Sequence, residues 1–351
     1  MFSHIVIRRL NGAIAALMGA WLALWIDIPL PWLLGPLFAV ASLRLASAPI
    51  AAYVPLRNAG QWIIGVSLGL YFSPQIVDLI AQHWPLLLLG MLISLLLALI
   101  GTWLLCSIGK VDLKTAWFSS AIGGASEMSV LAERYGARVD LVATAHSLRV
   151  LAVVTIIPFG FMWFGLSGSD VSLVSGLPIN YWHVVVIFIL ATAASFLFQK
   201  LDVASAWVLG PLLVTAILTV SEITITSIPD WVVNIGQLFL GWSLGDRYRP
   251  AFFKAAPRFL LAVCIFALLG IFTVAMIGLA VTQWTTLALP TLWLGMAPGG
   301  LVEMAITAKV LMLGVPMVTA FQASRMAFVV IVTGTIYQRI LEPWGKQRRL
   351  T

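Results

Sequence analysis

Two short stretches of this 351-residue chain hold the residue types and spacing that could do chemistry. Residues 123–128 read GGASEM and residues 299–304 read GGLVEM. The glutamates, Glu127 and Glu303, fall in apolar runs, where an ionisable side chain is costly and usually faces a cavity. Each could bind a proton, a cation or a substrate. Alternatively, each caps a helix end and ties the local chain together.

An arginine follows each glutamate at the same distance along the chain. Arg149 and Arg325 lie about ten residues into predicted helices of about 25, which places each roughly 15 Å from the helix end. Each arginine could neutralise a glutamate, or it could receive an anionic substrate through its fork of donors. His146 and Gln322 precede the arginines by three residues and share their helical face. His146 could carry a proton or form a hydrogen bond inside the bundle.

Paired glycines interrupt both stretches, at Gly123 and Gly124 and again at Gly299 and Gly300. Glycine costs about 1 kcal/mol relative to alanine inside a helix, so we expect a break at each pair. The half-helix after each break would direct free N–H groups and partial positive charge at one place, which attracts anions. A break of this kind is tolerated in a membrane only where it faces protein or a water-filled cavity.

Composition predicts a helical protein with many membrane spans. Apolar residues make up 61% of the chain and charged residues 9%, whereas soluble domains have about 25% charged residues. The net charge of +7 is expected to lie in cytoplasmic loops rather than on a surface for nucleic acid. The four histidines have no i, i+3 or i, i+4 pairs, which argues against a metal oxidase. We expect no metal, no cofactor and no catalytic residue.

The chain matches itself when it is shifted by 176 residues. Twelve of the 38 positions in 113–150 are identical in 289–326, and a shift of 175 aligns WLLGPL (32–37) with WVLGPL (207–212). This indicates a duplication. Ile122 and Pro298 differ just before the glycines, so the two breaks are expected to differ slightly in shape.

Each half is expected to contain five spans and one broken element. The halves are 10–165 and 181–341, with spans at 10–26, 30–46, 55–72, 84–107 and 139–164, then at 181–199, 204–220, 229–245, 257–281 and 316–340, and with broken elements at 113–136 and 289–314. If the broken elements do not cross, every loop rich in Lys and Arg is cytoplasmic, as are both termini. Five is an odd number, so the second half is inverted relative to the first.

The repeat, the doubled Gly-Gly-x-x-Glu-Met motif and the downstream Arg149 and Arg325 make the chain resemble the AbrB-type duplicated membrane proteins of Gram-negative bacteria. These are unrelated to the small DNA-binding regulator of the same name. Members are labelled regulators of gene expression, transporters or ammonia monooxygenases. The resemblance implies a bacterial inner (cytoplasmic) membrane, but it transfers no site residues.

Inverted halves around a midplane site are a common transporter plan. We therefore expect an ion-coupled secondary transporter or exporter of a small organic anion, driven by H⁺ or Na⁺, and not an enzyme. The alternative is a membrane-bound regulator that affects gene expression through a partner on a loop such as 246–258, or indirectly. The expected partners are the lipid bilayer and a small-molecule or ion substrate. The sequence is compatible with a homodimer and leaves the oligomeric state open.

Overall fold

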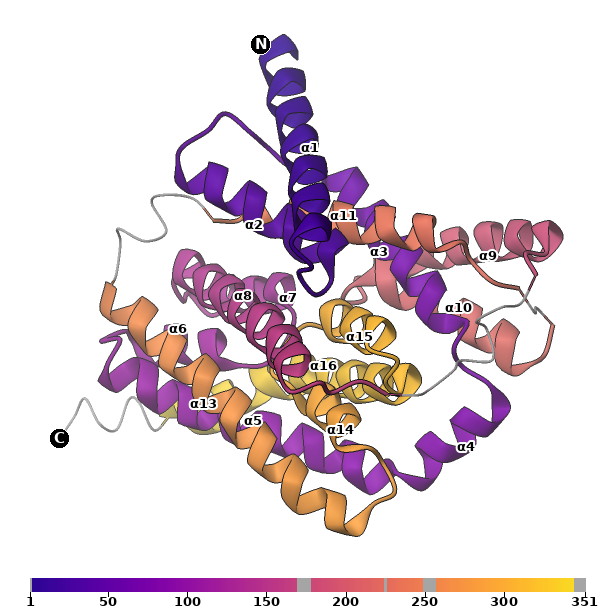
Figure 1. Cartoon of the computed structure of the whole chain (residues 1–351). Helices are drawn as coiled ribbons and strands as arrows, with labels where there is room; N and C mark the ends of the chain where they lie inside the picture. Colours follow the sequence, from indigo (N-terminus) through magenta and orange to yellow (C-terminus); the bar gives the residue numbers. More distant parts are fainter. Residues whose placement is uncertain (1, 169–177, 224–225, 249–256, 344–351) are drawn as a thin grey trace. The chain divides into compact units, whose positions relative to one another are not determined.

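The computed structural model in Figure 1 describes residues 2–168, 178–223, 226–248 and 257–343, and these contain helices and no strand. Within these described residues, six helices are long and apolar enough to cross a membrane. The protein is therefore a helical membrane protein, as composition predicts. These spans are His4–Trp25, Trp84–Ser107, Val139–Trp163, Tyr181–Lys200, Pro257–Trp284 and Val315–Leu341.

The predicted count of ten spans needs shorter helices as well. Pro31–Leu45 and Ala206–Val220 are apolar but have only 15 residues each, and Asp230–Gly245, predicted as a span at 229–245, has 16. Val54–Gly69 and Pro74–Gln82 count as one further span if they are taken together, although an 89° bend separates them. Several charged residues used to orient the predicted loops lie outside the described residues: Asp170, Arg249, Lys254, Lys346, Arg348 and Arg349.

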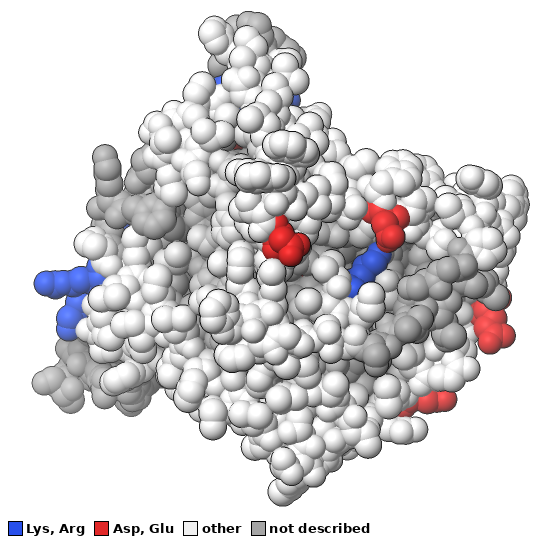
Figure 2. Space-filling view, viewed as in Figure 1, with Lys and Arg blue, Asp and Glu red and all other residues white. Residues whose placement is uncertain are grey.

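Uncharged residues dominate the face seen in Figure 2. Large apolar side chains such as Leu96, Trp103 and Phe272 are exposed along the long helices. An exposed apolar surface of this kind would cause aggregation in water, whereas contact with lipid acyl chains stabilises it. The outer surface therefore agrees with the membrane class.

The chain divides into two compact units. The first unit comprises residues 1–82, 157–252 and 305–316, and it contains α1 (Phe2–Trp25), α2 (Pro31–Leu45), α3 (Val54–Gly69), α4 (Pro74–Gln82), α9 (Tyr181–Lys200), α10 (Ala206–Val220) and α11 (Asp230–Gly245). The second unit comprises the rest, and it contains α5 (Trp84–Ser107), α6 (Leu113–Ser120), α7 (Ala125–Arg134), α13 (Pro257–Val281) and α14 (Leu289–Met296). Three helices belong partly to each unit: α8 (Val139–Trp163), α15 (Leu301–Val310) and α16 (Val315–Ile336).

Glycines allow the helices of the first unit to approach closely. Helix α3 packs on α10 and α11, and α11 packs on α2 and α3. A β-carbon added to Gly60 would lie 2.7 Å from the carbonyl oxygen of Gly236, and one added to Gly236 would lie 3.3 Å from that of Gly60. Small residues that let backbones meet are typical of packed membrane helices. Gly60 and Gly236 occupy equivalent positions in the sequence repeat, so the two halves cross at the same residue.

Element bounds recur at the shift found in the sequence. Helices α3, α6 and α7 correspond residue for residue to α11, α14 and α15, 176 positions later. Left-handed backbone conformations recur as well, at Leu30 and Ser205, with φ of 54° and 51°. Non-glycine residues rarely adopt this conformation, so its recurrence is more specific than a match of apolar letters.

The second unit packs around the first half-helix, α6. Thr102 Oγ1 and Ser120 Oγ lie 2.8 Å apart and join α5 to α6. Trp117 Nε1 donates to the carbonyl oxygen of Thr333 on α16 at 3.0 Å. These buried groups hold the half-helix against both neighbours.

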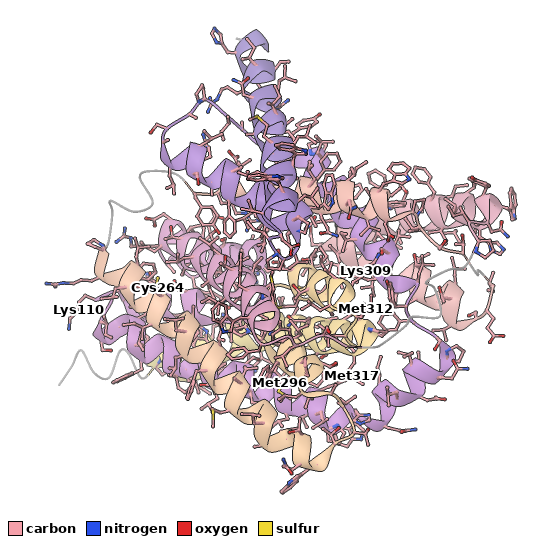
Figure 3. The ribbon with its side chains drawn as sticks, in the orientation of Figure 1. Lys110, Cys264, Met296, Lys309, Met312 and Met317 are labelled. Atoms are coloured by element: carbon pink, nitrogen blue, oxygen red, sulfur yellow. The ribbon has the colours of Figure 1, made fainter. Side chains whose placement is uncertain are left out.

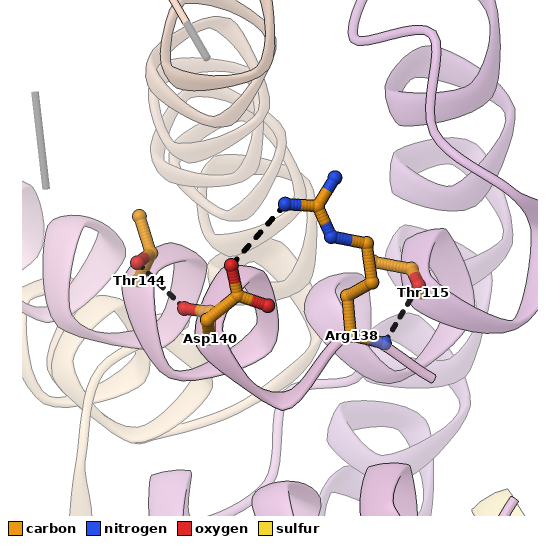
Figure 4. Close-up of polar contacts among 4 residues, drawn as sticks. All are labelled: Thr115, Arg138, Asp140 and Thr144. Carbon is orange, nitrogen blue, oxygen red and sulfur yellow. Dashed lines mark hydrogen bonds and ion pairs between the residues drawn. The ribbon is translucent and has the colours of Figure 1, made fainter. Parts of the chain in front are cut away.

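Helix α8 begins beside α6, as Figure 4 shows. The backbone N–H of Arg138 donates to Thr115 Oγ1 at 3.0 Å, and its guanidinium pairs with Asp140 at 3.2 Å. Thr144 Oγ1 donates to the Asp140 carbonyl oxygen at 2.7 Å. These contacts fix the start of α8 and so set which α8 residues face α6.

Candidate functional site

Both glycine pairs interrupt a helix, and the two breaks have similar backbones. Helix α6 ends before Ala121 (φ −54°, ψ 129°), and α14 ends before Ala297 (φ −53°, ψ 140°). Gly124 is the N-cap of α7, and its carbonyl oxygen accepts the first intrahelical bond. The difference expected from Ile122 and Pro298 is not seen at these alanines.

In the first half, α8 supplies polar groups to the end of α6. Arg149 is 2% exposed, and its Nη1 donates to the Ala121 carbonyl oxygen at 3.1 Å. Its Nη2 lies 3.1 Å from Nδ1 of His146. His146 is 1% exposed, and its Nε2 lies 2.9 Å from the carbonyl oxygen of Phe118. The two side chains thus reach the last turn of the half-helix together.

In the second half, α16 does the same for α14. Arg325 Nη1 donates to the Ala297 carbonyl oxygen, and Nη2 donates to the Gly299 carbonyl oxygen at 2.7 Å. The same Nη2 donates to Gln322 Oε1 at 2.5 Å. Gln322 Nε2 in turn donates to the carbonyl oxygen of Leu294 at 2.8 Å. Phe118 and Leu294 are 176 positions apart, so three bonds of the two arrangements correspond. The second half adds bonds from Arg325 to Gly299 and from Gln322 to Gly295 and Ala297.

The physical reason lies in the helix ends. The last carbonyl groups of a helix lack intrahelical partners and carry partial negative charge. A buried half-helix must have them satisfied, and a guanidinium supplies both donors and positive charge. The spacing of His146 and Arg149 predicts that they share one helical face, but it leaves Glu127 or a substrate as the expected partner of the arginine. The predicted helix stop at Gly123 and Gly124 leaves the carbonyl groups after Trp117 without intrahelical partners. This lack of partners could have indicated that Arg149 contacts the backbone.

Each guanidinium also retains a donor. The Nε atoms of Arg149 and Arg325 are buried without a hydrogen-bond partner among the described groups. A buried donor without a partner costs about 1–3 kcal/mol. The two guanidinium groups are close enough for their charges to repel each other. This paired positive centre would gain from a bound anion.

The glutamates lie over the N-termini of the half-helices that follow. Glu127 is in the first turn of α7, and Glu303 is in the first turn of α15. A β-carbon added to Gly124 or Gly300 would collide with the carboxylate of the glutamate three residues later. Each carboxylate therefore folds back over its glycine and complements the positive helix end. Only glycine leaves room for this arrangement.

Sequence analysis did not single out Lys309, which lies near the end of α15 (Figure 3). Its Nζ donates to Ser67 Oγ at 3.0 Å and lies 5.7 Å from the centre of the Tyr71 ring. Its equivalent in the first half is Glu133, so the repeat pattern drew no attention to it. Lys309 is an ammonium group held by a hydroxyl and an aromatic face.

Within the described residues, no three His, Cys, Asp or Glu side chains gather closely enough to hold a metal ion. Cys106 and Cys264 are free thiols. The polar groups at the breaks are donors and carboxylates on half-helix ends, which suits the binding of small charged solutes.

Fold and site together define a helical membrane protein with two matching broken elements. A family model described as "Transition state regulatory protein AbrB" matches residues 32–341, and the chain belongs to this AbrB family. The sequence is 28% identical to "Putative regulator AbrB" of Escherichia coli (strain K12), covering 92% of this chain and 93% of the relative. It is 25% identical to "Uncharacterized protein YhjN" of Bacillus subtilis (strain 168), covering 98% and 94%.

Proposed function

We propose that this protein is an ion-coupled secondary transporter or exporter of a small organic anion. The observation that carries the proposal is the matched pair of Arg149 and Arg325. Each buried guanidinium donates from Nη1 to a half-helix end, and its Nε–H has no hydrogen-bond partner among the described residues. An anion that accepts from these donors would also reduce the repulsion between the two charges.

The half-helices add to this preference. Each break directs a helix N-terminus at its own glutamate, Glu127 or Glu303, whose carboxylate occupies the place where a substrate anion could bind. A substrate carboxylate would compete with the glutamate for these N–H groups. Exchange between the glutamate carboxylate and a substrate carboxylate would allow the site to bind and release the substrate.

The transport proposal includes two inverted halves around this site. Helix bounds and left-handed residues that recur 175–176 positions apart support the duplication. Ten spans require four short helices, α2, α3, α10 and α11, to cross as well, although a helix of 15 or 16 residues is only about 22–24 Å long against roughly 30 Å of hydrocarbon. Their middle residues are buried among other helices, so neighbouring protein can cover a short span.

In this proposal the protein lies in the bacterial inner (cytoplasmic) membrane, as the family resemblance implies, and both termini are cytoplasmic. The N-terminal Arg8 and Arg9 and the C-terminal Arg348 and Arg349 would then be inside, as the positive-inside bias favours. The proposal assigns binding and release to the site and no bond-making chemistry.

A regulatory role is the second candidate, because the name of the Escherichia coli relative describes a regulator. A direct role would need a partner that docks on the cytoplasmic face, whereas an indirect role would follow from transport of a signal molecule. Pull-down from native membranes distinguishes them, since a stoichiometric partner is required only by the direct role.

The test of the transport proposal is flux in proteoliposomes with lactate, succinate and benzoate as probe anions, under H⁺ and Na⁺ gradients. Flux of at least one probe is expected in the wild type, and its loss is expected when Glu127→Gln and Glu303→Gln are combined. Glu222→Gln, at an exposed position after α10, is the matched control. Unchanged flux in the double variant would remove the two carboxylates from the mechanism.

A further inference from the structure

The two arginine clusters share one hydrogen-bond pattern but differ in one chemical property. Arg149 Nη2 meets Nδ1 of His146 where Arg325 Nη2 meets Oε1 of Gln322. The Nε2 atom of each partner faces a carbonyl oxygen in the last turn of its half-helix, Phe118 for His146 and Leu294 for Gln322. A neutral histidine and a glutamine are therefore equivalent in this position. Only the histidine can take up a proton between about pH 5 and 8.

The contacts of His146 determine its protonation state. A guanidinium can only donate, so Nδ1, 3.1 Å from Arg149 Nη2, must accept. The carbonyl oxygen of Phe118 can only accept, so Nε2, 2.9 Å away, must carry the hydrogen. His146 is thus the neutral Nε2–H tautomer in this arrangement.

A proton on Nδ1 would change the charge of the whole cluster. It would remove the acceptor of Arg149 Nη2 and place a second cation beside the guanidinium. Arg325 on α16, whose surroundings include Arg149, adds a third positive charge, while α6 presents carbonyl oxygens to His146 and Arg149. An anion bound at Arg149 would offset this accumulation of charge. Anion binding and proton uptake therefore favour each other.

We propose that His146 is the proton-coupling group of the carrier and that Gln322 leaves the second half without one. On binding, the proton joins His146 Nδ1, and the Arg149 Nη2–H bond to Nδ1 is exchanged for a bond to an anion oxygen. One proton accompanies one monoanion, so their charges cancel. This inference rests on the proposed anion transport and names its coupling ion as H⁺.

The protonation of His146 can be measured without transport. A protein with His4→Gln, His83→Gln and His183→Gln, labelled with ¹⁵N-histidine in lipid nanodiscs, reports His146 alone by NMR. We expect the Nε2–H tautomer at neutral pH and a doubly protonated ring on acidification. We also expect lactate to shift this titration to higher pH. An Nδ1–H tautomer, or a ring that does not titrate, would overturn the proposal.

Coupling is measured by accumulation of lactate, succinate or benzoate in proteoliposomes under a pH gradient. One pH unit can drive up to about tenfold accumulation of a monoanion that travels with one proton. Because neutral benzoic and lactic acid cross lipid unaided, accumulation is compared with protein-free liposomes. We expect an excess in the wild type and no excess in His146→Gln, which copies the second half and should keep its melting temperature. Accumulation by the variant equal to the wild type would overturn the coupling role. Wild type that titrates as expected but moves no probe would refute the transport proposal and retain the proton switch.

Discussion

Replacement of Arg325 by methionine tests whether the guanidinium holds the end of α14. Methionine keeps an apolar stem of similar length and removes three donated bonds, to Ala297, Gly299 and Gln322. Hydrogen bonds of a charged group contribute about 1.5–3 kcal/mol each. The Ala297 carbonyl oxygen retains Gln322 Nε2 at 3.2 Å, and repulsion from Arg149 is relieved. We therefore expect the free energy of unfolding to fall by about 3 kcal/mol.

The assay is reversible unfolding in mixed micelles, followed by tryptophan fluorescence, with amide hydrogen exchange over Leu289–Met296. Faster exchange is expected there, because the last carbonyls lose their charged partner. Arg258→Met, at an exposed position, removes the same charge and should change little. Arg325→Lys should recover only part of the loss, since an ammonium cannot copy the planar fork. An Arg325→Met protein as stable as the Arg258 variant, with unchanged exchange in α14, would refute the reasoning.

Three further predictions concern single contacts. Gly124→Ala should displace the Glu127 carboxylate and lower anion flux with little loss of stability. The control is Gly160→Ala, whose added β-carbon would meet nothing within 4 Å, and it should leave anion flux unchanged. Thr102→Val and Ser120→Ala should show a coupling of about 1 kcal/mol in a double-mutant cycle of unfolding, and strict additivity would contradict their bond. Lys309→Met should lower the melting temperature more than Lys309→Arg, and equal values would show that the cation is not needed.

The sequence predicted the broken elements well because their determinants are local. Paired glycines before Glu127 and Glu303 indicate a helix stop and restart, and the repeat placed both at one register. The span predicted at 84–107 coincides with α5 because Pro85 and a long apolar run define its start and course. The nine-residue α4 was missed, since it is too short for a span and lies beyond a turn after α3.

The partners of the buried arginines could not be predicted. Arg149 has a carboxylate and a set of orphan carbonyls within plausible reach along the chain, and choosing between them requires the relative placement of α6 and α8. That placement depends on the Thr115–Arg138 contact and on packing around Trp117, which involves residues far apart in sequence. Spacing identifies which side chains share a face, but it cannot identify what that face meets.

The guanidinium bonds have a mechanical consequence. They tie the half-helix before each break to the last helix of the same half, through Arg149 to α6 and through Arg325 to α14. A rearrangement that separated α6 from α8, or α14 from α16, would leave a buried guanidinium without its hydrogen-bond partners. Each of these helix pairs should therefore move as one rigid body. Rotation would then fall on the residues beyond these bonds, at Gly123–Gly124 in the first half and at Gly300 in the second, where Arg325 also holds the Gly299 carbonyl oxygen.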